Sequence, residues 1–368
     1  MQVTPARILT VNAGSSSLKL RVLGPGDAVL AARECGAIGG GEELRGELEA
    51  ILAAGAVDAA GHRFVHGGPD FDGPTPVDPG VEAQLEGLAD LALLHNPPAV
   101  AAMRALEALA PGLPNVACFD TAFHTTIPAA ASTYAVPESW SRRWPLRRYG
   151  FHGLSHAYAS RRAAELLGRP PAVLRLVSAH LGAGASLAAV AAGRSVDTTM
   201  GFTPLEGLVM ATRSGSVDPG LLLWVQRHGG VEAEAMEGAL EHESGLLALS
   251  GRSGDMREVL AGLEAGDERC RLAFDVYVHR LAAAIAAMAT AMGGLDALVF
   301  TGGVGENSPR IRAAAAQATA FLGVELDPAR NETASGDTDL SGPGASARCL
   351  RVEAREDIEI ATQVRSVI

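Results

Sequence analysis

Three side chains in this sequence have the chemistry to hold an anionic substrate. Arg63 lies between two histidines at the end of a strand-like run that a Gly-Gly pair follows, Arg213 lies among hydroxyl and glycine residues, and Asp120 directly follows the apolar run Val116–Phe119. Guanidinium groups bind the planar oxygens of carboxylates and phosphates in pairs. A carboxylate at the carboxyl end of a strand can hold Mg2+ or orient a nucleophile. Taken singly, each residue is equally consistent with a surface side chain or a cap.

His152 is a fourth candidate, because a glycine lies two residues before it and another directly after it. Glycine lets the chain turn sharply and present an imidazole to a ligand, although a single histidine is more often structural. Ser155 is expected to cap the helix that follows, and Asn96 is expected to cap the helix that begins at Pro98.

Three loops of small residues can approach a phosphate closely. Asn12–Lys19 joins two predicted strands through a serine-rich tip, and His180–Ser186 repeats the same order of strand, small tip and strand. Gly302–Asn307 lies between an apolar strand and a helix. Glycines allow backbone N–H groups to face phosphate oxygens. None of the loops has Walker A or Rossmann spacing, and each alone is also an ordinary turn.

Loops of this kind, together with two arginines, an aspartate and several histidines, indicate phosphoryl transfer. That chemistry needs positioning and charge neutralisation more than a covalent nucleophile. No Gly-x-Ser-x-Gly elbow favours a hydrolase instead.

The chain is long enough for two domains and has the composition of an ordinary soluble protein. The chain has 368 residues and a net charge of −12, which argues against nucleic acid as a partner. Its four cysteines form no CxxC pair, which predicts reduced thiols and a cytoplasmic location. No signal peptide is evident, and the Ala-rich run Leu281–Gly294 is too short to span a bilayer, so no membrane contact is expected.

The elements that must position these residues alternate between α and β, which predicts an α/β protein with mixed sheets. Strands are predicted at Arg7–Val11, Leu18–Leu23, His62–His66, Val116–Phe119, Leu174–His180, Leu187–Ala191 and Ala297–Thr301. Helices are predicted at Val81–Ala92, Pro98–Leu109, Ser155–Leu167, Leu221–Arg227, Cys270–Met292 and Asp357–Val367. Ser335–Ala347 is expected to be a loop. The repeated hairpin suggests two similar domains that face a shared cleft, with a boundary within Asp120–Tyr149.

The chain resembles the acetate kinase family across essentially its whole length. The motifs that carry the resemblance are Asn12–Lys19, His62–His66, His95–Pro98, Phe119–His124, Tyr149–Gly153, His180–Gly182, Gly201–Gly207, Thr212–Gly215 and Gly305–Ser308. The resemblance implies two actin-like (ribonuclease H-like) domains of duplicated βββαβαβα topology flanking a nucleotide cleft. Domain I would comprise 1–123 plus 358–368. Domain II would comprise 124–357, bind the nucleotide and form a homodimer.

The resemblance also implies a reaction, in which ATP and acetate give ADP and acetyl phosphate by direct in-line transfer with Mg2+ or Mn2+. Arg63 and Arg213 would hold the carboxylate and the transferring phosphoryl group, and His152 would stabilise that group. Asp120 and Glu356 would organise the metal ion, with Asn12 beside it.

Further residues follow from the same motifs. The methyl pocket would consist of Val65, Leu94, Phe151 and Pro204. The phosphate loops would contribute Asn12, Ser15, Ser17, Lys19, His180, Gly182 and Gly184. Gly302, Gly303, Gly305, Glu306 and Asn307 would flank the adenosine.

The chain departs from the family pattern at several positions. Ala183 stands where the family usually has Asn, Ala211 where it has Gly, and Ser216 where it has Asp.

Two other functions are alternatives to acetate kinase. A propionate or butyrate kinase is the nearest alternative, and a non-catalytic actin-like nucleotide-binding module is the alternative of another class. A pyrophosphate-linked enzyme is disfavoured by the intact Gly302–Asn307 motif.

Overall fold

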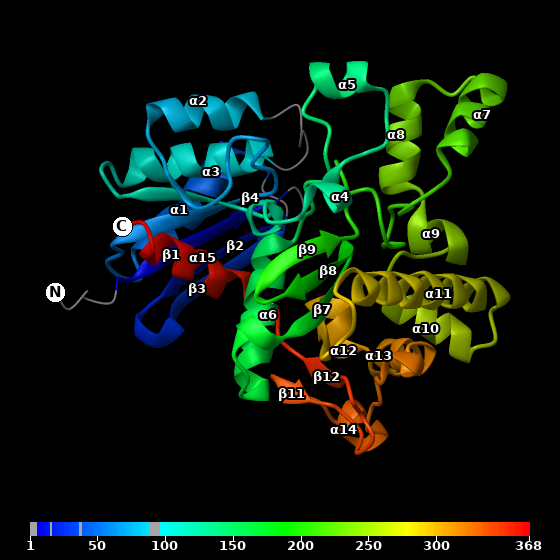
Figure 1. Cartoon of the computed structure of the whole chain (residues 1–368). Coiled ribbons are helices and arrows are strands. Elements are labelled where there is room, and N and C mark those ends of the chain that lie inside the picture. Colours follow the sequence, from blue (N-terminus) through cyan, green and yellow to red (C-terminus); the bar gives the residue numbers. More distant parts are fainter. Residues whose placement is uncertain (1–5, 15–16, 37–38, 89–95) are drawn as a thin grey trace. The chain divides into compact units, whose positions relative to one another are not determined.

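The computed structural model describes residues 6–14, 17–36, 39–88 and 96–368, and these form two compact units. Unit 1 comprises Met1–Thr125, Phe151–Tyr158 and Arg355–Ile368, and unit 2 comprises Thr126–Gly150 and Ala159–Ala354 (Figure 1). Unit 1 therefore differs from the expected domain I in that it also includes residues 124–125, 151–158 and 355–357.

Unit 1 is built from one sheet and the helices on its two faces. Its elements are β1 (Ile8–Ala13), β2 (Ser17–Leu23), β3 (Val29–Gly36), α1 (Gly41–Leu52), β4 (Ala59–Phe64), β5 (Thr75–Pro76), α2 (Pro79–Gly87), α3 (Asn96–Leu109), β6 (Asn115–Phe119) and α15 (Glu356–Arg365). The helix α6 (Gly153–Leu167) begins in unit 1 and ends in unit 2. The strand order is β3-β2-β1-β4-β6-β5.

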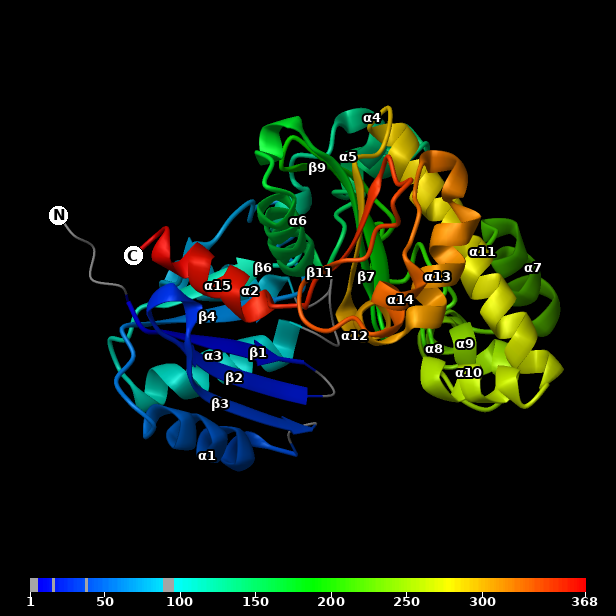
Figure 2. The same ribbon diagram turned by 90° about the horizontal axis from the view of Figure 1, so that it is seen from below.

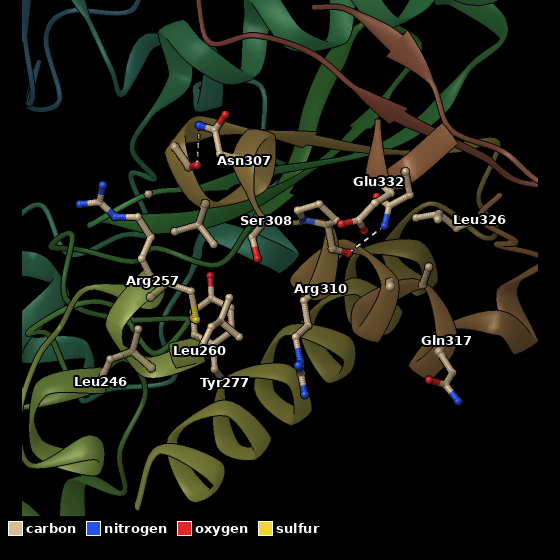
Figure 3. A pocket seen from close by; sticks show the side chains of 18 of the residues that line it. Leu246, Arg257, Leu260, Tyr277, Asn307, Ser308, Arg310, Gln317, Leu326 and Glu332 are labelled. Atoms are coloured by element: carbon tan, nitrogen blue, oxygen red, sulfur yellow. Dashed lines mark hydrogen bonds between the residues drawn. The ribbon is translucent and has the colours of Figure 1, made fainter. Parts of the chain in front are cut away.

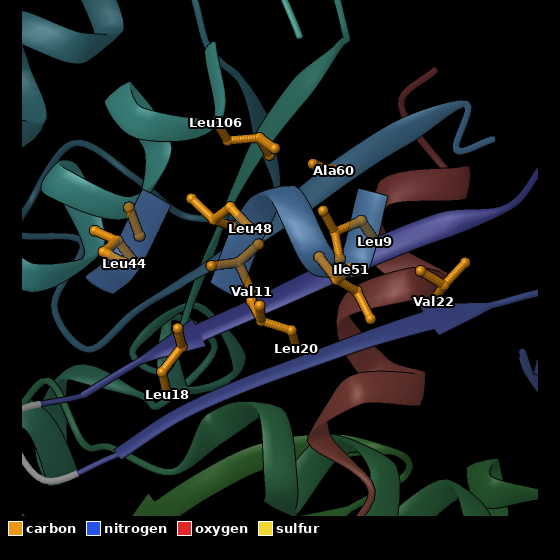
Figure 4. Close-up of a cluster of buried hydrophobic side chains, with 11 residues drawn as sticks. Leu9, Val11, Leu18, Leu20, Val22, Leu44, Leu48, Ile51, Ala60 and Leu106 are labelled. Carbon is orange, nitrogen blue, oxygen red and sulfur yellow. The ribbon is translucent and has the colours of Figure 1, made fainter. Parts of the chain in front are cut away.

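Alternation along the strands gives this sheet two different faces. On one face, Leu9, Val11, Leu18 and Leu20 pack with residues of α1 and α3 into a buried cluster (Figure 4). On the other face, the buried residues of β1, β4 and β6 pack against α15. Figure 2 shows α15 and α1 on opposite sides of the strands.

Unit 2 also contains one sheet, but more helices. Its elements are α4 (Ala129–Ser132), α5 (Glu138–Arg143), β7 (Arg175–Leu181), β8 (Ala185–Ala191), β9 (Arg194–Thr198), α7 (Pro219–Gly229), α8 (Ala233–His242), α9 (Gly245–Ser250), α10 (Met256–Glu264), α11 (Glu268–Ala291), β10 (Ala297–Thr301), α12 (Gly302–Asn307), α13 (Pro309–Ala318), α14 (Pro328–Glu332), β11 (Thr338–Asp339) and β12 (Arg348–Arg351). The strand order is β11-β12-β10-β7-β8-β9.

The two sheets have the same topology, which confirms the duplicated fold. In each, three antiparallel strands that are consecutive in sequence (β1–β3 and β7–β9) continue into two parallel strands (β4 and β6, β10 and β12). A short antiparallel strand closes the far edge of each sheet, β5 in unit 1 and β11 in unit 2. Asn12 in β1 and His180 in β7 hold the same place, one residue before the strand end.

The helix α11 is the main covering helix of unit 2. By length and composition alone it could cross a membrane. In unit 2 it packs against β7, β8 and β9 as well as α9, α10 and α13. Tyr277, Leu281 and Ile285 on it are buried. The helix predicted at Cys270–Met292 is thus confirmed.

Several sequence-based boundaries need correction. The predicted strand His62–His66 is instead Ala59–Phe64, so His66 lies beyond its end. Neither predicted cap holds, because α3 already includes Asn96 and α6 begins two residues before Ser155. The expected loop Ser335–Ala347 contains β11. The end of the predicted helix Val81–Ala92 lies outside the described residues.

Candidate active site

Asn12, Arg63 and Asp120 share one face and one edge of the unit 1 sheet. They lie at or just beyond the carboxyl ends of β1, β4 and β6, which are adjacent and parallel. Side chains alternate along a strand. Each of the three residues follows by four positions a residue that packs against α15, namely Ile8, Ala59 and Val116. Because four is an even spacing, the three side chains belong to the α15 face. In open α/β sheets, ligands bind at this edge.

Arg63 is the centre of the resulting cluster. Its Nε lies 3.2 Å from each carboxylate oxygen of Asp120, and its Nη2 donates to Oδ2 of Asp120 at 2.6 Å. Its Nη1 donates to Oδ1 of Asn12 at 3.3 Å and lies 3.6 Å from Oε2 of Glu356, the first residue of α15. The amide of Asn12 in turn donates to Glu356 at 3.3 Å. The structure therefore brings together four residues that are far apart in sequence.

The charges in this cluster are strongly coupled. Asp120 is 1% exposed, whereas Arg63 and Glu356 are each 19% exposed. Burial alone would lower the pKa of Arg63, but the charges of Asp120 and Glu356 raise it. Burial raises the pKa of Asp120, and the charge of Arg63 opposes that change. The partly exposed side of Arg63 is the side that an anion can approach.

His152 lies next to this cluster through the backbone. It has a positive φ of 56°, which is rare for a residue with a Cβ. The N–H of Gly153 donates to the carbonyl of Asp120 at 2.9 Å, and a Cβ on Gly153 would lie 2.1 Å from that oxygen. Only glycine permits this approach, so Gly153 ties the turn that carries His152 to the residue that pairs with Arg63.

Of the four predicted methyl-pocket residues, the structure describes three. Phe151 is fully buried, and its ring lies edge-on to that of His66 with centroids 5.4 Å apart. Val65, just after β4, is half-buried. Pro204 belongs to unit 2, and Leu94 lies outside the described residues.

Arg213 in unit 2 is also held by a carboxylate. Its Nε lies 2.8 Å from Oε2 of Glu241 on α8, and its Nη1 donates to the carbonyl of Pro204 at 3.4 Å. Sequence reasoning did not identify Glu241, because nothing in the run Glu241-His-Glu243 distinguishes it from a solvated helix end.

Unit 2 contains a large cavity of about 1260 Å³ (Figure 3). Of the predicted nucleotide residues, Gly182, Gly303 and Asn307 line it. Ala183, at the position of the usual asparagine, lines it as well, so its methyl group takes the place of an amide there.

Other predicted nucleotide residues shape the cavity without lining it. Glu306 accepts from the N–H groups of Gly302 and Ala354, both at 2.9 Å, so its carboxylate fixes the turn. Gly302 has a φ of 78°, and a Cβ there would lie 2.8 Å from the carbonyl of Leu181. His180, Gly184 and Gly305 are also absent from the cavity wall as the described residues define it.

The cavity has lining residues that sequence reasoning missed. They include Asp255, Met256 and Arg257 at the start of α10, and Tyr277, whose hydroxyl is buried and has no hydrogen-bond partner among the described residues. The only sequence signal was an aspartate ahead of a helix, where its side chain caps α10 by accepting from the N–H of Arg257.

The phosphate loop of unit 1 is partly described. The N–H of Gly14 donates to the carbonyl of Ser17 at 2.9 Å, which closes the turn, and Ser15 lies outside the described residues. Lys19 is half exposed and pairs with Glu34 on β3 at 3.1 Å. It shares a strand register with Asn12 and so lies on the same face of the sheet.

The donor set in unit 1 suits a hard divalent cation. Carboxylates of Asp120 and Glu356 and the amide oxygen of Asn12 are oxygen ligands, which Mg2+ prefers, and Mg2+ is commonly bound by one or two carboxylates together with substrate phosphates. Over the ranges that the structure describes, no group of three or more His, Cys, Asp or Glu side chains forms a metal cage.

A doubled α/β unit with arginine–carboxylate clusters and a nucleotide-sized cavity defines a kinase that phosphorylates a small anion. The chain matches the acetokinase family model over residues 44–362 and belongs to that family. It is a phosphotransferase with a carboxylate acceptor, and the family implies ATP or ADP and a divalent metal ion.

Individual relatives agree. The chain is similar to an acetate kinase from a Synechococcus strain, with 45% identity over 402 residues that cover 98% of this chain and 99% of that protein. It is similar in structure to Porphyromonas gingivalis acetate kinase (TM-score 0.90, 36% identity, 98% and 99% coverage). It is equally similar to a propionate kinase from Francisella tularensis (TM-score 0.91, 33% identity, 99% and 100% coverage).

Proposed function

We propose that this protein is a cytoplasmic enzyme that transfers the γ-phosphoryl group of ATP directly to acetate, giving acetyl phosphate and ADP, with Mg2+ as the metal ion. The observation that carries the proposal is the Arg63 cluster. It combines a partly exposed guanidinium with two carboxylates at the edge of the sheet where ligands bind.

The residues would act mainly by neutralising charge. A carboxylate is already ionised at neutral pH, so the acceptor needs no strong general base. The difficulty is to bring it against an anionic phosphoryl group, and fixed cationic donors offset that repulsion. Arg63 and Arg213 would supply these donors, and His152 would donate to the phosphoryl oxygens as charge develops on them.

Asp120 and Glu356, with Asn12, would hold the metal ion. When bound, Mg2+ would neutralise charge on the phosphate oxygens. Asp120 would also fix the guanidinium plane of Arg63 through its two-pronged contact.

The nucleotide would occupy the cavity of unit 2. Gly303, at the start of α12, and Asn307, the last residue of that helix, lie on its wall. His180 and Gly182, in and just after β7, would contact the phosphates. The proposal requires residues of both units to act on one phosphoryl group.

Propionate is a second candidate acceptor, because the structure is similar to that of a propionate kinase. One additional methylene changes discrimination by only about 1–3 kcal/mol. We favour acetate because the curated relatives that match nearly the whole chain or most of it are named acetate kinases.

Steady-state formation of acyl hydroxamate from ATP with acetate, propionate or butyrate tests the proposal. We expect the highest kcat/KM for acetate and loss of activity in Arg63→Ala. The matched control is Arg33→Ala, which removes an exposed arginine of β3 that pairs with Glu47 on α1. Highest kcat/KM for butyrate, or full activity in Arg63→Ala, would reject the proposal.

We also propose that the enzyme is a homodimer formed through unit 2. All three tryptophans of the chain are there, and Trp140, Trp144 and Trp224 are 45–59% exposed. Aromatic side chains are enriched at protein interfaces. Light scattering should give twice the chain mass, and a Trp224→Asp variant should shift it toward the monomer. A wild-type monomer would rule the dimer out.

A further inference from the structure

Arg213 is held by a carboxylate that comes from another element, as Arg63 is. The contact is between its Nε and Oε2 of Glu241 at 2.8 Å, and the two side chains are only 20% and 14% exposed. An ion pair that is largely removed from water is screened less than a surface pair, so it fixes geometry more firmly.

The contact uses the Nε edge of the guanidinium. Arginine has five N–H donors, one on Nε and two on each terminal nitrogen. Oε2 of Glu241 lies beside Nε as an ion-pair contact, and the carbonyl of Pro204 accepts from Nη1. In the part of the chain that the structure describes, Nη2 has no protein acceptor, so this nitrogen and one hydrogen on Nη1 remain for an anion.

The backbone around Arg213 is fixed separately from the Glu241 carboxylate. The hydroxyl of Thr212 donates to the carbonyl of Glu241 at 2.8 Å, and the N–H of Ser214 donates to the carbonyl of Leu240 at 3.0 Å. The N–H of Ser244 donates to the carbonyl of Thr212 at 2.9 Å. None of these bonds involves the carboxylate, so its removal should free the guanidinium without releasing the loop.

We propose that Glu241 is a positioning residue for Arg213: its carboxylate holds the guanidinium by Nε and so presents the Nη edge to the anionic substrates. This inference rests on the proposed function, because it assumes that Arg213 contacts those substrates. Glu241 itself touches no substrate and acts only through Arg213.

A double-mutant cycle in the full-length protein tests this role. In Glu241→Ala we expect kcat/KM for acetate to fall about 10- to 100-fold, within the range of coupling energies between residues of one salt-bridge network. Glu241→Gln, which keeps an acceptor oxygen, should lie between wild type and Glu241→Ala. KM for ATP should not change. A general disturbance of unit 2, in contrast, would raise KM for ATP as well.

The decisive comparison is made in the Arg213→Ala background. There the further change Glu241→Ala should alter kcat/KM by less than about twofold, because residues that act through one another are not additive. Glu237→Ala, at an exposed position of the same helix, is the control and should behave like wild type.

The outcomes separate the two proposals. Wild-type kinetics in Glu241→Ala, or an equal loss with and without Arg213, overturns the positioning role while leaving the proposed function intact. Full activity in Arg213→Ala overturns the proposed role of Arg213 and this inference with it.

Discussion

The contact between Asp120 and Arg63 yields the most specific prediction. Asp120→Asn keeps the size of the side chain and one acceptor oxygen but removes the charge that faces three guanidinium contacts of 2.6–3.2 Å. Removing one partner of a fully buried ion pair costs about 3–5 kcal/mol. Arg63 is 19% exposed and keeps its contacts with Asn12 and Glu356. We therefore expect a smaller stability loss of about 1–3 kcal/mol.

The catalytic effect of Asp120→Asn should exceed the effect on stability. The substitution removes both the orientation of Arg63 and a carboxylate proposed to hold the metal ion. We expect kcat to fall roughly 100-fold or more, since each 1.4 kcal/mol of lost transition-state stabilisation is a factor of ten. Urea unfolding and the hydroxamate assay measure the two quantities on the same preparation.

The exposed Asp70 provides the control, and Asp70→Asn should leave both quantities unchanged. If Asp120→Asn keeps kcat within about threefold of wild type while remaining folded, the role assigned to this cluster is wrong.

Two further predictions concern other parts of the chain. Burial lowers the pKa of His62 to about 4, so between pH 6.5 and 4 the unfolded chain binds a proton that the folded protein does not; stability should fall over this window by up to about 3 kcal/mol. In urea titrations, His62→Gln should reduce this loss of stability, and His228→Gln, at an exposed position, should not. Equal pH profiles of stability for wild type and His62→Gln would contradict the prediction. Gly302→Ala should raise KM for ATP about tenfold, because its Cβ would meet the Leu181 carbonyl. Gly336→Ala, also at positive φ but with no atom nearby, should not; an unchanged KM in Gly302→Ala would count against the cavity as the nucleotide site.

Much of the fold could be predicted from periodicity. The strand Ala297–Thr301 and the helix near Cys270–Met292 were predicted correctly, because the pattern of apolar residues in each segment indicates its secondary structure. The edge strands β5 and β11 were not predicted, since each spans two residues and is defined by its neighbour rather than by its own sequence.

Site residues could be predicted where the position of a single side chain in the sequence indicates its role. They could not be predicted where the role depends on a contact with a distant residue. Arg63 and Asp120 could be identified from their places at strand ends, and the alternation from Ile8, Ala59 and Val116 would have placed them on one face. Glu241 could not, because its role depends on a contact across 28 residues of chain with Arg213.

Asn96 shows how tertiary contacts override a local rule. As an asparagine ahead of Pro97 and Pro98 it fits a helix cap, yet its side chain accepts from the N–H of His66 and donates to the carbonyl of His66 at 3.0 Å. It is fully buried, so these bonds satisfy polar groups that would otherwise be unpaired. Its task is to hold the turn after β4, which follows Arg63.

The central claim is that a carboxylate oxygen attacks the γ-phosphorus of ATP, and oxygen labelling tests it most directly. Wild-type enzyme is incubated with MgATP and acetate carrying ¹⁸O in both carboxylate positions, and the acetyl phosphate is observed by ³¹P NMR. We expect the phosphorus of every product molecule to be bonded to one ¹⁸O, namely the oxygen that bridges it to the acetyl group. Acetyl phosphate whose bridging oxygen is unlabelled would contradict it.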